Sequence, residues 1–217
     1  MNKIRTMEEI MEHIKDGMTI MVGGFMGVGT PETIIDAMVE KGVKDLIIIA
    51  NDTALSDRGV GKLVVNKQVK KVIASHIGLN PETGRQMNSG ELAVELVPQG
   101  TLAEQIRCGG AGIGGFLTET GVGTIVEEGK QKLTVNNKKY ILELPLRADI
   151  ALIGASSADK SGNLFYNAST KNFNPMMATA ADLVIVGAEK IVETGELDPN
   201  HVMTPGIFVD YILGGEN

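Results

Sequence analysis

The sequence predicts an α/β fold: an open, mostly parallel central sheet with helices on both faces, plus a small β-hairpin region. Short continuous apolar runs, such as residues 46–49, are typical of strands covered on both faces. Segments with helical apolar spacing alternate with these runs and begin at capping signals. The 217 residues include 27 glycines and only 7 prolines, which fits many tight turns between strands and helices. No change in composition marks a linker, so we expect one domain spanning residues 1–217.

The first helix has a start and a stop signal. Thr6 and Glu9 form an S/T-x-x-E capping box, and apolar residues follow at positions 7, 10, 11 and 14. Gly17 comes after the last of these positions and is expected to end the helix. Residues 18–22 are apolar and short enough to form the next strand.

A glycine-rich turn and a second helix come next. Residues 23–29 read GGFMGVG. Thr30 is the expected N-cap of the helix, and Pro31 occupies its first position, where a missing N–H is harmless. Apolar residues at positions 34, 35, 38 and 39 face the core, and Gly42 is the expected stop.

Later strands are expected in five places, at residues 46–49, 72–74, 92–97, 150–153 and 183–186. Four of them are continuous apolar runs. In the strand at 92–97, Leu92, Val94 and Leu96 alternate with the residues between them, which predicts that these three side chains share the covered face.

A second capping pattern and a hairpin lie between these strands. Thr101 and Glu104 repeat the capping box, which predicts a short helix ending at Gly109-Gly110. Residues 133–142 read as a hairpin around Asn136-Asn137, because asparagine tolerates the left-handed backbone that tight hairpins require.

Composition and charge argue against several functions. The net charge is −7 and basic residues come in pairs at most, so nucleic acid is not an expected partner. The single cysteine, Cys108, excludes an intrachain disulfide and fits a reducing, cytoplasmic setting. The N-terminus turns acidic before an apolar run develops, so we expect no signal peptide. No apolar stretch approaches the roughly 20 residues of a membrane span, and the three histidines show no metal-ligand spacing.

Polar and glycine-rich segments follow the predicted strands. Ligands of open parallel sheets bind outside the carboxyl ends of the strands. The residues at these ends are therefore the expected site, namely 23–30, Asn51-Asp52, Ser75-His76 and 98–100.

The turn at 23–30 has the features of an anion site. It leads from a strand into a helix, where unpaired N–H groups and the helix dipole attract negative charge. A turn that only packs helix against sheet is the alternative. A dinucleotide fold fits poorly, because Gly24-x-x-Gly27-x-Gly29 is not G-x-G-x-x-G and Asn51, not an acid, ends the next strand.

The segment 16–31, DGMTIMVGGFMGVGTP, resembles the first signature of family I CoA transferases. Other segments are similar to the α subunits of acetate or butyrate:acetoacetate CoA transferases, in the same order and over nearly the whole chain. They are residues 50–53, 78–90, 98–102, 107–112, 120–124 and 171–175.

This resemblance implies an enzyme that moves CoA between acetoacetyl-CoA and acetate or butyrate, with CoA as substrate and no cofactor or metal. In that family a glutamate of a Ser-Glu-Asn-Gly motif on the β subunit becomes a glutamyl-CoA thioester in a ping-pong cycle. The motif is absent here, and Glu119 and Glu91 are expected to be structural or surface carboxylates. The resemblance therefore implies a β-type partner in a hetero-oligomer such as α2β2, with no catalytic nucleophile in this chain.

Site residues are assigned on the same basis. The expected CoA-contacting turn comprises Gly24, Phe25, Met26, Gly27, Val28, Gly29 and Thr30. The resemblance places Asn51 and Gln99, with Gly100, beside the acyl group and the partner glutamate. Amide donors at that place would stabilise the oxyanion that develops when a carboxylate attacks a thioester.

Other candidates are weaker. Cys108 lacks a spaced histidine partner, so a buried structural thiol is favoured over a nucleophile, and His76 is expected to have a polar packing role. A regulatory effector- or sugar-phosphate-binding domain, or a sugar-phosphate isomerase, remains the alternative function. A regulator should carry a basic helix-turn-helix, which the sequence lacks.

Overall fold

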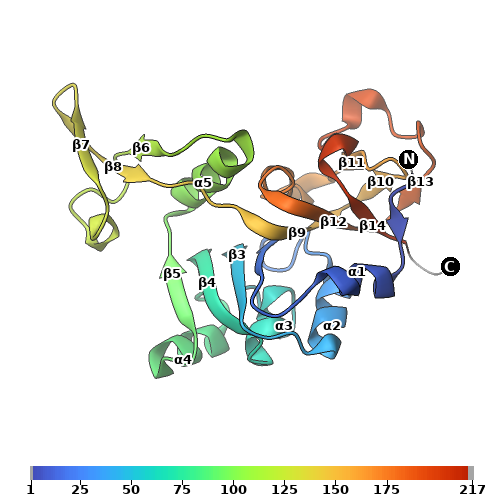
Figure 1. The fold of residues 1–217 in the computed structure, drawn as a ribbon, viewed down its shortest axis with the longest axis horizontal. Helices are drawn as coiled ribbons and strands as arrows, with labels where there is room; N and C mark the ends of the chain where they lie inside the picture. The colour runs from blue at the N-terminus through green and yellow to red at the C-terminus, as the bar shows by residue number, and fades with distance from the viewer. Residues whose placement is uncertain (1, 215–217) are drawn as a thin grey trace.

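A parallel eight-stranded sheet forms the centre of the computed structural model, which describes residues 2–214 (Figure 1). Every neighbouring pair in this sheet is parallel. The strands, in spatial order, are β1 (Ile4–Arg5), β14 (Tyr211–Leu213), β12 (Ala181–Ala188), β9 (Ala148–Ala155), β2 (Thr19–Val22), β3 (Leu46–Asp52), β4 (Val69–His76) and β5 (Ala93–Leu96).

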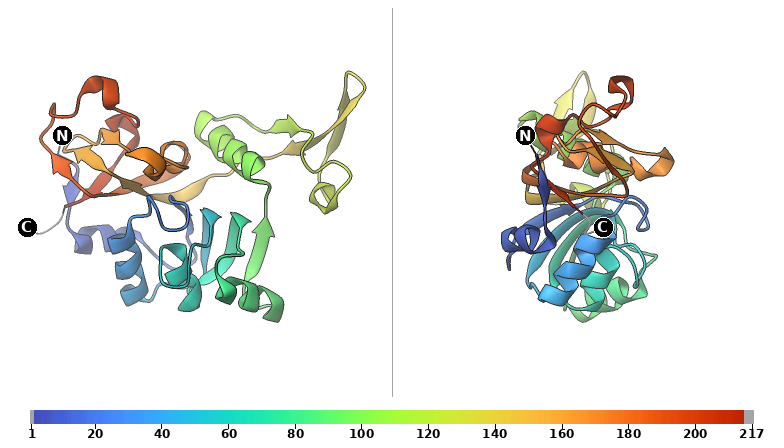
Figure 2. Two further views of the ribbon diagram at one scale, coloured as in Figure 1. Left: turned by 180° about the vertical axis from the view of Figure 1, so that it is seen from behind. Right: turned by 90° about the vertical axis from the view of Figure 1, so that its right-hand side faces the viewer.

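Helices cover both faces of the sheet, as predicted, and each face has its own apolar core (Figures 1 and 2). On one side lie α1 (Met7–His13), α2 (Glu32–Lys41), α3 (Val60–Val65) and α4 (Pro81–Ser89). On the other side lie α5 (Gln99–Ala111) and α6 (Asn174–Met177). Ile34, Leu63 and Ile48 belong to the core of the first face, whereas Leu102 and Met177 belong to the core of the second. Among the described residues, no helix is both long and apolar enough to cross a bilayer.

Two small sheets extend the second face. One consists of β6 (Phe116–Thr118), β8 (Lys138–Glu143) and β7 (Lys132–Val135), all antiparallel, and we call residues 113–146 the arm. Figures 1 and 2 show the arm extending beyond the end of the central sheet. The other consists of β11 (Leu164–Phe165), β10 (Ser157–Asp159) and β13 (Ile191–Val192). Single 3₁₀ turns lie at Ile125–Glu127, Ala168–Thr170, Pro199–His201 and Gly206–Phe208.

Strand β2 marks the point where the order of the sheet reverses. It pairs with β3 on one side and with β9 on the other. The chain runs outward through β3, β4 and β5 before it returns to β9. In open α/β sheets a crevice forms at such a point outside the carboxyl ends of the strands. The glycine-rich turn that follows β2 lies there.

Several local predictions are confirmed. The capping box at α1 is complete, with Thr6 accepting from the Glu9 N–H and Glu9 accepting from the Thr6 N–H. Gly42 ends α2 in a left-handed conformation with φ of 69°. Asn136 and Asn137 form the hairpin turn with φ of 50° and 61°.

Two predicted helix starts are wrong. Thr30 does not cap α2, because its hydroxyl donates to the Gly23 carbonyl and the N-cap position falls on Pro31. Thr101 and Glu104 form no capping box either. Helix α5 already begins after Pro98, so Thr101 lies inside it and is 4% exposed.

Helix α5 also continues through the predicted stop at Gly109-Gly110 and ends at Gly112. A Cβ on Gly109 would lie 1.9 Å from the Leu146 carbonyl oxygen, and a Cβ on Gly110 would lie 2.1 Å from the Thr179 hydroxyl. These glycines therefore allow close packing of the helix, and they do not end it.

The expected alternation of β5 holds only in part. Leu92 is buried, but Leu96 is 53% exposed and Val97 is 4% exposed. The strand ends at Leu96, and the chain then turns so that Val97 enters the core beneath α5.

Candidate functional site

The glycine-rich turn is held from behind by two asparagines that are distant in sequence. Asn172 accepts from the Gly24 N–H at 3.0 Å and donates to the Val28 carbonyl at 3.0 Å. Asn174 is fully buried and donates to the Gly29 carbonyl at 2.9 Å. A Cβ at Gly24 or Gly29 would collide with neighbouring atoms at 2.0 Å and 2.6 Å. These contacts therefore hold the turn in a fixed position after β2.

The N–H groups of the turn are largely used inside the chain. Those of Gly24, Phe25, Met26, Val28 and Thr30 all donate to protein acceptors. The expected anion cradle of unpaired N–H groups is therefore not formed here. The turn instead presents apolar side chains, with Phe25 41%, Met26 38% and Val28 48% exposed.

Neutral polar side chains gather at the carboxyl ends of β3, β4 and β5, where the sequence predicts the site: the amides of Asn51 and Gln99 and the hydroxyl of Ser75. The buried Asn51 side chain accepts from the Gln99 amide at 3.2 Å. The Ser75 hydroxyl is shared between the Asn51 backbone carbonyl at 2.7 Å and the Asn51 Oδ1 at 3.0 Å. Gln99 and Ser75 thus both contact Oδ1 of Asn51, so its Nδ2 donors face away from these partners. Asn51 and Gln99 are therefore brought together.

The N-terminus of α5 lies beside this pair. Gln99 and Gly100 are the first residues of this 13-residue helix, and the helix has no side-chain cap. Both residues are exposed. The first N–H groups of an uncapped helix lack intrahelical acceptors and carry the positive end of the dipole. The structure thus provides anion-stabilising donors at Gln99-Gly100 rather than at the glycine-rich turn.

Two cavities flank the turn. The larger, about 510 Å³, lies between the turn, the start of α2 and the ends of β9 and β12, and its lining includes Gly29, Thr30, Gly154 and Gly187. The smaller, about 330 Å³, lies on the α3 side and is lined by Gly27, Val28, Glu32, Asp57, Arg58 and Lys62. Lys62 is paired with Glu32 at 2.8 Å and with Asp36 at 2.6 Å. Arg58 makes no ion pair within residues 2–214, so it is the cation open to a ligand there.

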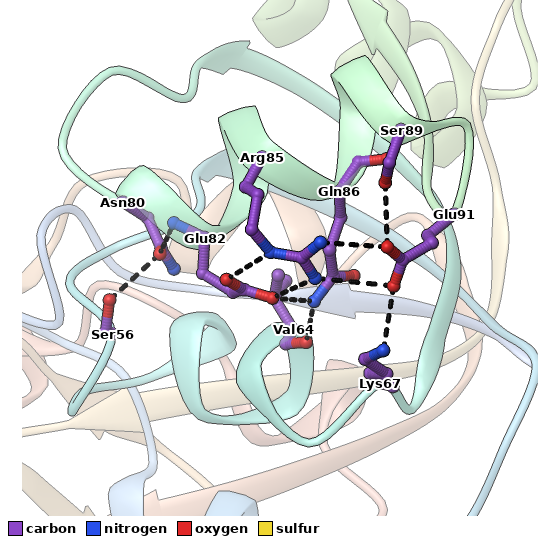
Figure 3. A network of polar contacts seen from close by, with 9 residues as sticks. All are labelled: Ser56, Val64, Lys67, Asn80, Glu82, Arg85, Gln86, Ser89 and Glu91. Carbon is purple, nitrogen blue, oxygen red and sulfur yellow. Dashed lines mark hydrogen bonds and ion pairs between the residues drawn. The ribbon is translucent and has the colours of Figure 1, made fainter.

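Glu91 and Glu119, the two carboxylates considered from the sequence, are not close to the amides of Asn51 and Gln99. Glu91 precedes β5, at the amino end of the strand and opposite the end that Gln99 follows, and it accepts from Arg85 and Lys67 (Figure 3). Hydrogen bonds from Arg85 hold the pKa of Glu91 well below its usual range. Glu119 lies on the arm and pairs with Lys138 at 3.1 Å. These contacts agree with structural and surface roles for both residues.

Of the remaining candidates, Cys108 fits a packing role, whereas the polar packing role of His76 stays a prediction. Cys108 is fully buried, and burial raises the pKa of its thiol, which disfavours the reactive thiolate. His76 ends β4 opposite Asp52 and is exposed at the site edge. Within residues 2–214, His, Cys, Asp and Glu side chains form no group of three or more suited to a metal ion.

Sequence reasoning assigned no contact to three residues that shape this site; it placed Asp52 at the site but took Asn51 as the end of the strand, whereas β3 ends at Asp52. Asn172 and Asn174 hold the turn, and Asp52 accepts from the Met26 N–H at 2.9 Å. Asn172 and Asn174 fall in one of the segments that resemble the family, and Asp52 ends a strand, so the sequence points to these positions. The sequence does not predict their hydrogen bonds, because up to 148 residues separate the two bonded residues.

Comparison with known proteins is consistent over the full chain. Residues 4–215 match the family described as Coenzyme A transferase. The acetate CoA-transferase subunit alpha of Escherichia coli K12 is 61% identical, with 97% of this chain and 96% of that protein covered. The acetoacetyl-CoA:acetate/butyrate CoA transferase alpha subunit of Clostridium acetobutylicum is 53% identical, with 98% and 97% covered.

Solved structures agree on the fold. An acyl-CoA transferase from Escherichia coli O157:H7 has a TM-score of 0.84 at 22% identity, and this chain spans 46% of that longer polypeptide. Glutaconate coenzyme A-transferase from Acidaminococcus fermentans has a TM-score of 0.85 at 19% identity, with 97% of this chain and 75% of that one covered. With a family match over nearly every residue and relatives above half identity, the chain belongs to the coenzyme A transferase family.

Proposed function

We propose that this chain is the α subunit of a short-chain acyl-CoA:carboxylate CoA transferase that uses acetoacetyl-CoA with acetate or butyrate. The names of the relatives at 61% and 53% identity support this substrate class. The enzyme works in the cytoplasm, with CoA as substrate and no cofactor. A β-type partner subunit completes it in a hetero-oligomer such as α2β2.

The partner supplies the nucleophile. A glutamate carboxylate of the partner attacks the thioester carbon, and the carbonyl oxygen becomes an oxyanion that collapses as the CoA thiolate leaves, giving an acyl-glutamyl anhydride. The thiolate then attacks the glutamyl carbonyl carbon and releases the donor carboxylate, which leaves a glutamyl-CoA thioester. The acceptor carboxylate attacks this thioester and runs the same steps in reverse, so that the thiolate ends on the acceptor's acyl carbon. In this chain Asp52 already accepts from two backbone N–H groups, and Glu32 accepts from the Gly59 N–H and pairs with Lys62, which disfavours either as the attacking group.

The amides of this chain stabilise the charge. Asn51 Nδ2, the Gln99 amide and the Gly100 N–H are neutral donors, so they stabilise an oxyanion without competing as nucleophiles. Their alignment needs no rearrangement during the reaction, because Ser75 and Gln99 already fix Asn51. Preorganised donors of this kind account for a large part of many rate enhancements.

The turn from Gly24 to Thr30 contacts CoA. Its exposed Phe25, Met26 and Val28 suit the apolar and amide-bearing arm of CoA better than its phosphates. Arg58, beside Gly27, is the cation within reach of a phosphate. The partner covers the remaining apolar surface at this edge.

The hydrogen bond from Gln99 to Asn51 at 3.2 Å is the main structural support for this proposal. It brings an amide from the end of β3 and an amide from the start of α5 into one site. The test is a CoA-transfer assay of the purified chain alone and together with a β-type partner. We expect no transfer by the chain alone and transfer when the partner is added. Robust transfer by the isolated chain would contradict the division of labour.

A further inference from the structure

The tip of the glycine-rich turn has a backbone that a methionine rarely adopts. Phe25 and Val28 exchange two hydrogen bonds, at 3.0 Å and 2.9 Å, so Met26 and Gly27 form a two-residue hairpin turn. Their φ angles are 53° and 86°. Such a turn requires left-handed backbone at both central positions, which glycine accepts and methionine resists. Another contact must therefore hold Met26 in place.

That contact is the buried carboxylate of Asp52. Its Oδ2 accepts from the Met26 N–H at 2.9 Å, and its Oδ1 accepts from the Ala54 N–H at 2.9 Å. Ala54 is also left-handed, with φ of 49°. Asp52 is only 4% exposed, and hydrogen bonds to a charged acceptor are stronger than neutral ones. One carboxylate thus holds two unfavourable backbone positions.

Asp52 also follows Asn51 directly at the end of β3. The turn that contacts CoA and the amide that faces the thioester are therefore joined through one rigid residue. We propose that Asp52 is a positioning residue, which fixes the acyl-CoA-binding turn relative to Asn51. This inference rests on the proposed function.

The isosteric variant Asp52→Asn tests it in the complex with the β-type partner. An asparagine has one acceptor oxygen, so its NH₂ group must face either the Met26 or the Ala54 N–H. We expect kcat/KM for acyl-CoA to fall about tenfold, the effect of losing one hydrogen bond to a charged group. In the second half-reaction CoA is already attached covalently, so kcat/KM for the carboxylate should fall less than about threefold.

Asp159→Asn is the matched control. Asp159 is 2% exposed and accepts from the N–H groups of Ser161 and Asn163, but it lies in the small sheet of β10. It should lower the thermal midpoint without a selective loss for acyl-CoA. Equal kinetic changes in both variants would reduce Asp52 to a structural residue and overturn the proposal.

A rescue variant separates positioning from general damage. Met26→Gly makes the left-handed turn favourable without help from Asp52. In the Met26→Gly background, Asp52→Asn should therefore lower kcat/KM for acyl-CoA less than about threefold. If Asp52→Asn alone gives no soluble complex, the double variant should restore one. An undiminished loss, or no restored complex, would contradict the proposal.

Amide hydrogen exchange gives a readout that does not need activity. Asp52→Asn should speed exchange at Met26 or at Ala54 in the complex, whereas Asp159→Asn should leave both unchanged. Unchanged exchange at both positions in Asp52→Asn would refute the positioning role even in a fully active enzyme. If the parent complex lacks transferase activity but Asp52→Asn still speeds exchange, only the proposed function is refuted.

Discussion

The side-chain amide of Gln99 donates to Oδ1 of Asn51 across 3.2 Å, although 48 residues separate them. The Ser75 hydroxyl of β4 is shared between the Asn51 backbone carbonyl at 2.7 Å and the same Oδ1 at 3.0 Å. These contacts orient a buried amide at the end of β3. In the proposed function, the α subunit therefore holds these amide donors in place before the partner or the substrate arrives.

Removing the Gln99 amide should slow turnover more than it weakens substrate binding. In Gln99→Ala, Asn51 loses one of its two orienting donors, and the site loses an amide that acts when charge develops. We expect kcat to fall roughly 10- to 100-fold while KM for acyl-CoA changes little. Steady-state kinetics of the complex provides the measurement.

Gln131→Ala is the control for this change. Gln131 is an exposed glutamine of the arm, and its bond to Leu142 is made by its backbone carbonyl, which the substitution keeps. It should retain full turnover. An unchanged kcat in Gln99→Ala would count against the role of its amide.

Close packing behind the turn should make Gly154 intolerant of a side chain. A Cβ at Gly154 would lie 2.4 Å from the Gly29 carbonyl oxygen, which is backbone and has little freedom to move. Gly154→Ala should therefore lower the free energy of unfolding by about 1–3 kcal/mol and weaken acyl-CoA binding. Denaturant titration and kinetics would measure the two effects.

Gly84 provides the matched comparison. It lies within α4, and nothing stands within 4 Å of its added Cβ. Gly84→Ala should stabilise the fold by about 0.5–1 kcal/mol with no effect on activity. A Gly154→Ala variant as stable as the parent protein would show that the turn can move.

Tyr166 should control stability at alkaline pH. Burial raises the pKa of this phenol to about 12, and its hydroxyl pairs with Thr204 at 2.8 Å. The unfolded chain ionises near pH 10, so the stability from the protonated phenol is complete below pH 10 and is lost as the pH rises through about 12.

The variant Tyr166→Phe should be about 1 kcal/mol less stable at neutral pH, because it loses the bond to Thr204. Above pH 10 its free energy of unfolding should decline less steeply than that of the parent. Parallel slopes for Tyr166→Phe and the parent in denaturant titrations between pH 7 and 11 would contradict this account.

Sequence alone predicted the features that depend on neighbouring residues. The capping box of Thr6 and Glu9, the stop at Gly42 and the turn at Asn136-Asn137 are set within a few residues, so the pattern determines the geometry. The buried strands were also readable, because a parallel sheet covered on both faces needs continuous apolar runs. The fold class follows from these signals.

Features set by tertiary packing were missed. Thr101 has a capping signature but lies in the core, so helix α5 starts earlier, at the residues that form the site. Thr30 was expected to cap a helix and instead bonds the carbonyl of Gly23 across the turn. The turn was expected to offer unpaired N–H groups, yet Asn172 and Asp52 occupy two of them from distant segments. No local pattern predicts such pairings.

The central claim is that the atom attacking the thioester belongs to the partner subunit. The most direct test loads the complex with acyl-CoA, reduces it with borohydride and maps the modified residue by mass spectrometry. We predict modification of a glutamate on the partner and of no residue in this chain. Modification of Glu91, Glu119 or any other side chain of this polypeptide would contradict the account.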